Sequence, residues 1–196
     1  MIFRRLFSVA YCLSFAIAAN AQVNAPSPPQ TEQIEVGFAH LPGRPHVFFR
    51  IRLLPVSSFP QLPPSVAQQL AQRGCMIPQT YEARQPENVI HGSFEKKGSS
   101  DWAALCSIEG VTTLYVFFQS KPADPILLRH QPDSEWLGTE WSQDYGSAWG
   151  IATRPARLIQ HADSVNHDAI DDAFIEKSTT VHYFEKDQWT MLESQQ

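Results

Sequence analysis

The sequence predicts an α+β fold of mostly antiparallel β hairpins with one short helix at about residues 64–73, its sheets packed in a blade-like or sandwich-like way. Three observations support this class. Apolar and polar residues alternate over many short segments, as in half-buried strands. One segment has the start and stop signals of a helix. Two cysteines, Cys75 and Cys106, would join the end of that helix to a hairpin.

The first 21 residues have the parts of an export signal. Two arginines precede an apolar run over 6–19, and small residues follow at positions 19 and 21. The run is shorter than the roughly 20 residues that span a bilayer. We therefore predict an exported protein, periplasmic or secreted, with no membrane span.

The rest of the chain is acidic and has the size of one domain. Loss of the signal would remove two positive charges from a chain whose formal net charge is −5. An acidic balance disfavours nucleic acid and anionic membranes as partners. Residues 22–33 are rich in proline and predict a disordered tether. Residues 34–196 predict a single β-rich domain and a monomer, with an extracytoplasmic protein or a glycan as its partner.

The first element after the tether is a predicted hairpin around residues 41–45. In its second strand Phe49, Ile51 and Leu53 alternate with Arg50 and Arg52, so we expect one face to pack in the core and the other to face solvent. Further strands are predicted at 89–94, 102–107, 111–118, 149–153, 156–161, 173–176, 179–184 and 189–192.

The segment PPSVAQQLAQRGC predicts the helix. Prolines precede it, Ser65 is a candidate N-cap, and Val66 and Leu70 share an apolar face. Gly74 is the expected stop. Cys75 follows at once, and in an oxidising compartment we expect it to pair with Cys106. The alternative, a nucleophilic Cys106, requires a free thiol and a neighbouring base, and the alternating strand around Cys106 favours a buried position.

The stretch GSFEKKGSSD, residues 92–101, resembles the calcium loop of FG-GAP-type β-repeats, whose pattern is G-D-F-N-G-D-G-x-x-D. The resemblance covers the hairpin at 92–118 and implies blade-like antiparallel hairpins. Ser93, Glu95 and Lys97 replace the family's ligand positions, so the loop is degenerate. We expect Asp101 to cap the loop by accepting backbone N–H groups rather than to bind a metal.

The chain also resembles a group of secreted bacterial proteins of unknown function. The resemblance is carried by the segments GCMIPQ, NVIHGSF, DWAALCS and HDAIDDAF. It implies an exported location and no particular chemistry.

Two polar clusters are candidate sites. HADSVNHDAIDD has enough oxygen ligands for a divalent cation such as calcium, with Asp168, Asp171 and Asp172 as the favoured ligands. The alternative is a solvated loop with no ion. No other cofactor is expected.

The second cluster is EWLGTEWSQDYGSAWG, in which aromatic rings and carboxylates could bind a carbohydrate. The candidate ligand-binding residues are Trp136, Glu140, Trp141 and Tyr145. The alternative is an aromatic plug at the edge of the core.

Motifs for catalysis are sparse. The sequence has no G-x-S-x-G elbow, no glycine-rich phosphate loop and no C-x-x-C pair. We therefore expect a non-catalytic binding or interaction module. The alternative is an extracytoplasmic hydrolase that acts on carbohydrate through the 135–150 segment, which would require two carboxylates about 5–10 Å apart across a cleft.

Overall fold

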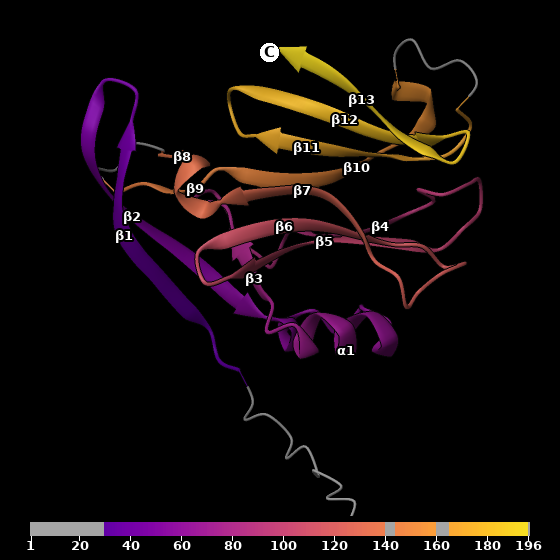
Figure 1. Ribbon diagram of the computed structural model, residues 1–196, viewed down its shortest axis with the longest axis horizontal. Helices are drawn as coiled ribbons and strands as arrows, with labels where there is room; N and C mark the ends of the chain where they lie inside the picture. The colour runs from indigo at the N-terminus through magenta and orange to yellow at the C-terminus, as the bar shows by residue number, and fades with distance from the viewer. Residues whose placement is uncertain (1–29, 140–143, 160–164, 196) are drawn as a thin grey trace, which may run out of the picture.

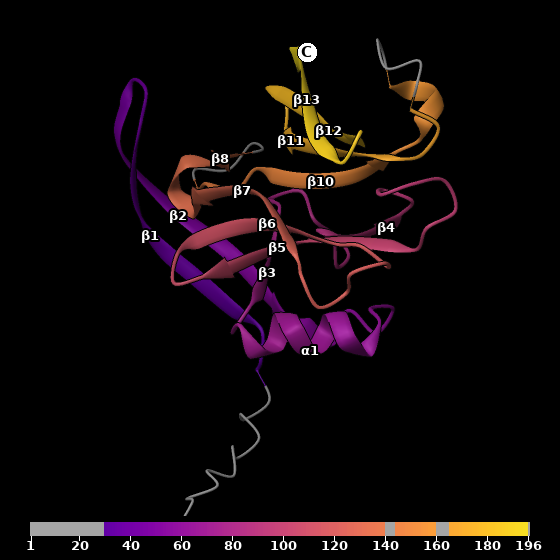
Figure 2. The ribbon, with the colours of Figure 1, turned by 45° about the vertical axis from the view of Figure 1, so that its right-hand side comes forward.

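The computed structural model describes residues 30–139, 144–159 and 165–195. In these ranges the chain forms a larger antiparallel sheet, a smaller four-stranded antiparallel sheet and one α-helix. Figures 1 and 2 show three layers, with the helix on one side of the larger sheet and the smaller sheet on the other. The predicted class, mostly antiparallel and sandwich-like with one helix, is confirmed at this level.

The larger sheet has the strand order β1-β2-β3-β5-β6-β7, with β4 paired to β5. Its strands are β1 (Gln33–Leu41), β2 (Arg44–Pro55), β3 (Met76–Gln79), β4 (Val89–Gly92), β5 (Asp101–Ile108), β6 (Val111–Phe117) and β7 (Ile126–Pro132). The β1–β2 hairpin reaches beyond the rest of the molecule in both views (Figures 1 and 2).

The smaller sheet runs in chain order through β10 (Trp149–Arg154), β11 (Ala169–Phe174), β12 (Ser178–Glu185) and β13 (Gln188–Gln195). Two short strands, β8 (Leu137–Gly138) and β9 (Gly146–Ser147), pair with each other. Three 3-10 turns complete the described elements: η1 (Val56–Ser58), η2 (Asp133–Glu135) and η3 (Ala156–Leu158).

Helix α1 spans Pro64–Gln72 and confirms the predicted helix at 64–73. Its N-cap is Pro63 and not Ser65, which lies inside the first turn. Pro64 occupies the first helical position, where the N–H that proline lacks would have no partner within the helix. Val66 and Leu70 are buried, as the spacing predicts. The helix ends before Gly74, whose φ of +79° is a left-handed conformation that favours glycine.

Strand β5 is buried on both faces and joins the layers. Ala104 and Cys106 pack with α1, whereas Ala103 and Leu105 pack with the smaller sheet around Trp149. The predicted Cys75–Cys106 disulfide is present, with its Cα atoms 5.0 Å apart. Because β3 and β5 share a single residue pair in the sheet, the disulfide reinforces the weakest junction of the larger sheet.

Some predicted elements were wrong. A strand was predicted at 156–161, but its first residues form the 3-10 turn η3, which follows Pro155 and is closed by backbone hydrogen bonds to the carbonyls of Pro155 and Ala156. Positions 160 and 161 lie outside the described residues. The strand predicted at 173–176 is the end of β11, which begins at Ala169. Strands β3 and β7 were not predicted, because each contains a proline and neither alternates cleanly.

Candidate interaction surface

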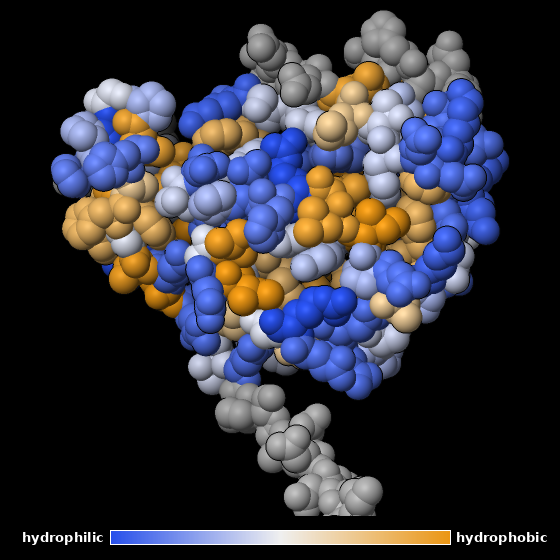
Figure 3. Space-filling model, viewed as in Figure 1, coloured by the Kyte–Doolittle hydropathy of each residue, from blue (hydrophilic) through white to orange (hydrophobic). Residues whose placement is uncertain are grey.

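The outer side of the β1–β2 hairpin presents apolar side chains to solvent. Ile34, Val36 and Phe38 alternate along β1 and are 48, 56 and 71% exposed. Phe48 on β2 lies directly across from Phe38, with the ring centroids 5.5 Å apart. In Figure 3 apolar residues gather over this hairpin. A continuous exposed patch of this kind is characteristic of a binding surface.

The opposite side of the hairpin already supplies its share of the core. Ala39, Val47 and Phe49 are buried there with their neighbours. Gly37 allows the close approach, because a Cβ at this position would lie 2.7 Å from the ring of Phe49. The hairpin therefore packs against the core through its inner side, and the apolar row on its outer side takes no part in that packing.

The outer side of β2 is cationic. Arg50 pairs in register with Val36, and Arg52 pairs with Ile34. Arg52 donates to Glu32 over 2.8 Å, and this hydrogen bond lowers the pKa of Glu32. We define the hairpin face as the outward side chains of both strands: Ile34, Val36, Phe38, His40, His46, Phe48, Arg50 and Arg52.

The hairpin face ends at an open sheet edge. Strand β1 is the terminal strand of the larger sheet, and no strand of the described chain pairs with its outer edge. A register shift between Ala39 and Leu41 interrupts the pairing with β2 near the tip. Residues Gln33–Ala39 therefore form a regular open edge, whose outward N–H and C=O groups are available to another chain.

A cleft of about 640 Å³ lies beside the start of β1. The end of α1 and the β5–β6 turn form its other walls, and its lining includes Glu35, Arg73 and Glu109. Burial, together with the charge and hydrogen bonding of Asp133, raises the pKa of Glu35 to about 7.

Glu35 and Asp133 form a carboxyl pair at this cleft. Asp133 is buried, and its Oδ2 accepts a hydrogen bond of 2.6 Å from Ser107 Oγ. Its Oδ1 has no other donor among the described residues. A protonated Glu35 carboxyl can donate a hydrogen bond to Asp133, which favours the protonated form of Glu35. Hydrogen-bonded carboxyls are closer together than the pair that glycoside hydrolysis requires.

Of the four predicted carbohydrate residues, the structure describes Trp136 and Tyr145. Trp136 stacks on Trp149 and Phe174, with centroids 4.8 and 5.0 Å away, and Arg129 lies 5.1 Å from its ring. Tyr145 lines a different cleft, of about 410 Å³, and bonds Arg44. Glu140 and Trp141 lie outside the described residues.

The three predicted calcium ligands have separate partners. Asp168 accepts from the backbone N–H of Ser93, and Asp171 pairs with Arg154. Asp172 is buried on the other side of β11. Within 30–139, 144–159 and 165–195 no group of three His, Cys, Asp or Glu side chains is placed to hold a metal. Calcium binding by these residues stays a prediction, and it would require these contacts to break.

Asp172 is instead the centre of a buried network between the two sheets. It accepts hydrogen bonds from Trp149 Nε1 at 2.6 Å and is 2.9 Å from His182 Nε2. Arg129 Nε lies 2.7 Å from the same carboxylate. These contacts account for the charge of Asp172 without an ion.

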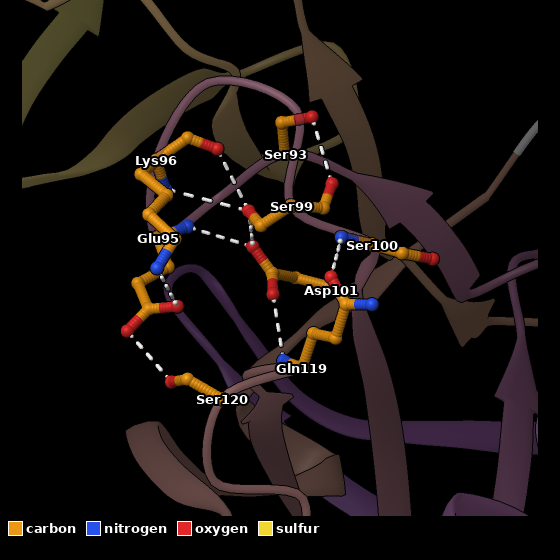
Figure 4. A network of polar contacts seen from close by, with 8 residues as sticks. All are labelled: Ser93, Glu95, Lys96, Ser99, Ser100, Asp101, Gln119 and Ser120. Carbon is orange, nitrogen blue, oxygen red and sulfur yellow. Dashed lines mark hydrogen bonds and ion pairs between the residues drawn. The ribbon is translucent and has the colours of Figure 1, made fainter.

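Asp101 caps the loop at 93–100, as predicted (Figure 4). Its carboxylate accepts the backbone N–H groups of Glu95 and Gln119 at 2.7 and 2.8 Å, and the hydroxyl of Ser99. The side chain is fully buried. With its oxygens engaged by protein donors, Asp101 fixes the loop without a metal.

The comparisons with known proteins give no family for this chain. No protein-family model, no curated protein and no solved structure matches it. Within the described residues no helix is long and apolar enough to cross a membrane. The function is therefore inferred from the geometry.

The sequence analysis missed the apolar row of β1 and the Glu35–Asp133 pair. In residues 34–39 one alternating set is strongly apolar (Ile34, Val36, Phe38) and the other is not, so the alternation favours burial of the set that the structure exposes. No sequence signal connects Glu35 to Asp133, because they are far apart in the chain.

Proposed function

We propose that the protein is an exported, non-catalytic binding module that uses the hairpin face to bind another protein outside the cytoplasm. One observation carries the proposal: Phe38, the most exposed large apolar side chain among the described residues, lies in a row on an open edge strand. Monomeric domains rarely expose such a row without a binding role.

Export is inferred from the N-terminal segment, with its two arginines, its short apolar run and its small-x-small end. The Cys75–Cys106 disulfide supports this inference, because disulfides persist in oxidising compartments and are rare in the cytosol. Periplasmic and fully secreted locations fit both observations equally.

A protein partner is favoured over a glycan. Sugar binding requires a free aromatic face, and the ring of Trp136 is covered by Trp149, Phe174 and Arg129. Phe38 is an exposed ring, but its neighbours in the hairpin face are apolar and cationic and include no carboxylate to bond sugar hydroxyls. A carbohydrate hydrolase built on 135–150 stays a prediction without a supporting contact.

The experiment is capture of a partner from the protein's own envelope extract by the chain from residue 22 onward. The test variant is Val36→Ser/Phe38→Ser, and the matched control is Leu158→Ser/Met191→Ser, which removes two exposed apolar side chains elsewhere. We expect the wild type and the control to retain the same protein in stoichiometric amount, and the test variant to lose it. Retention by all three would refute a role for the hairpin face.

A further inference from the structure

We propose that the hairpin face binds an extended, acid-bearing segment of a partner polypeptide, which adds to the edge of β1 as a further strand. This inference rests on the proposed function and specifies the partner. Its three supports are the open main chain of β1, the apolar row and the cationic row of β2.

The unpaired backbone groups at the edge of β1 favour a polypeptide partner over a lipid surface. An edge strand presents unpaired N–H and C=O groups along one side. A membrane would bury these groups against acyl chains, which offer no hydrogen-bond partners. An added strand satisfies them directly, and strand addition to an exposed edge is an established way to bind peptides.

The apolar row sets the side-chain pattern of the partner. In a strand added to β1, alternate residues lie on the same side as Ile34, Val36 and Phe38 and within contact distance of them. These positions favour β-branched or aromatic side chains. The regular edge at Gln33–Ala39 has room for a segment of about seven residues.

The charge of the hairpin face favours acids in the partner. Arg50 is exposed, and its guanidinium has no hydrogen-bond or ion-pair partner in the described chain. Arg52 is already paired with Glu32, and Arg44 at the tip contacts Tyr145. The rings of His40 and His46 contact each other at a tilt, with centroids 4.9 Å apart, and add no negative charge. The chain as a whole is acidic, so the hairpin face differs in sign from its own protein.

The same charges disfavour a second copy of this chain as the occupant. Two copies paired through β1 would bring together identical apolar rows with a cationic row on each side. Neither copy would offer a carboxylate to Arg50 from its own hairpin face. The full sequence carries a net charge of −5, and loss of the predicted signal makes it more negative, which opposes association of two copies.

The test uses seven-residue probe peptides with blocked ends and a fluorophore. In the first, positions 1, 3, 5 and 7, which lie on one side of an extended strand, are glutamate, valine, valine and glutamate, and threonine fills the positions between them. The second has lysine in place of glutamate, and the third is the glutamate peptide with N-methyl groups on alternate amides along one edge. Binding is measured by fluorescence anisotropy, and hydrogen exchange follows the amides of residues 33–39.

We expect the glutamate peptide to bind and to slow exchange at 33–39. Lysine or N-methylation should weaken binding at least tenfold. Arg50→Gln should weaken it severalfold, whereas Arg84→Gln, an exposed control outside the hairpin face, should not. Equal affinity for the glutamate and lysine peptides, or no effect of N-methylation, would overturn the proposal. Binding to vesicles of phosphatidylcholine and phosphatidylglycerol without peptide binding would indicate a lipid surface instead, and a dimer in sedimentation that Phe38→Ser abolishes would indicate a second copy.

Failure of this proposal is distinguishable from failure of the proposed function. If Val36→Ser/Phe38→Ser loses the captured partner but no probe peptide binds, the hairpin face is a binding surface with a different partner chemistry. If the captured partner is retained by that variant, the proposed function itself is wrong.

Discussion

Arg129 on β7 of the larger sheet and Asp172 on β11 of the smaller sheet form an ion pair, with Arg129 Nε 2.7 Å from Asp172 Oδ2. The carboxylate is fully buried and also bonds Trp149 and His182. The pair therefore links the two sheets through charge, in addition to the apolar packing between them.

Removal of the Asp172 carboxylate should destabilise the protein strongly. Asp172→Ala leaves the Arg129 charge and the Trp149 and His182 donors without their acceptor, at a cost of about 3–5 kcal/mol. The melting temperature should fall by about 10 °C. The control is the adjacent Asp171→Ala, which breaks a partly exposed ion pair with Arg154 and should cost less than about 1 kcal/mol. Equal losses for the two variants would contradict the central role of Asp172.

The Glu35–Asp133 pair predicts a pH dependence of stability. Glu35 keeps its proton in the folded state up to a pKa of about 7, against an ordinary value of 4.5. The folded state therefore binds more protons between these values, so the contribution of Glu35 is full below pH 4.5 and is lost as the pH rises through 7.

Glu35→Gln should remove this dependence, because a neutral amide resembles the protonated carboxyl. Thermal unfolding at pH 5 should be nearly unchanged. At pH 8 the variant should be more stable than the wild type by roughly 1 kcal/mol, a value reduced for the partial solvent exposure of Glu35, or about 2–4 °C. Glu109→Gln, in the same cleft, is the control and should keep the wild-type pH slope. A pH slope unchanged in Glu35→Gln would disprove the raised pKa of Glu35.

The Cys75–Cys106 bridge should contribute about 2–4 kcal/mol, because it closes a long loop and joins β3 to β5. Cys75→Ala/Cys106→Ala should lower the melting temperature by roughly 5–15 °C. Native protein, alkylated without reduction, should show no free thiol at these positions by mass spectrometry. Two free thiols in material from the host would refute both the bridge and the inference of export.

Calcium should not change the melting temperature. The oxygens of Asp101 already accept protein donors, and Asp168, Asp171 and Asp172 have separate partners. An ion that binds the folded state raises the midpoint. Identical melting curves in millimolar calcium and in chelator are therefore expected, and a higher midpoint in calcium would restore the metal site that the sequence suggests.

Local patterns were enough to predict much of the fold. The helix follows from two prolines, the Val66–Leu70 spacing and Gly74, all within one segment. The β5–β6 hairpin follows from the alternation on either side of Glu109-Gly110, a turn in which both residues have positive φ. Strand β3 was not predicted because its four residues, all buried, contain a proline and no alternation.

The contacts of the candidate site residues could not be predicted from the sequence, because they depend on partners distant in the chain. Asp172 was a candidate metal ligand from its acidic neighbours, and its actual partners are Arg129, Trp149 and His182. Trp136 was a candidate sugar platform, and its ring packs against Trp149 and Phe174. Composition identifies which groups are present, but it does not say which contacts they make.

By itself the sequence determined the secondary structure that depends on neighbours within about ten residues, the cysteine pair, and the N-terminal segment that predicts export. The tertiary structure alone decided which side of β1 faces solvent, that β1 is an edge strand, and that Glu35 meets Asp133. The physical reason is that alternation along a strand separates two faces but does not assign them. The assignment follows when one face is covered by another element, and on β1 the inner face is covered by Phe49 and its neighbours.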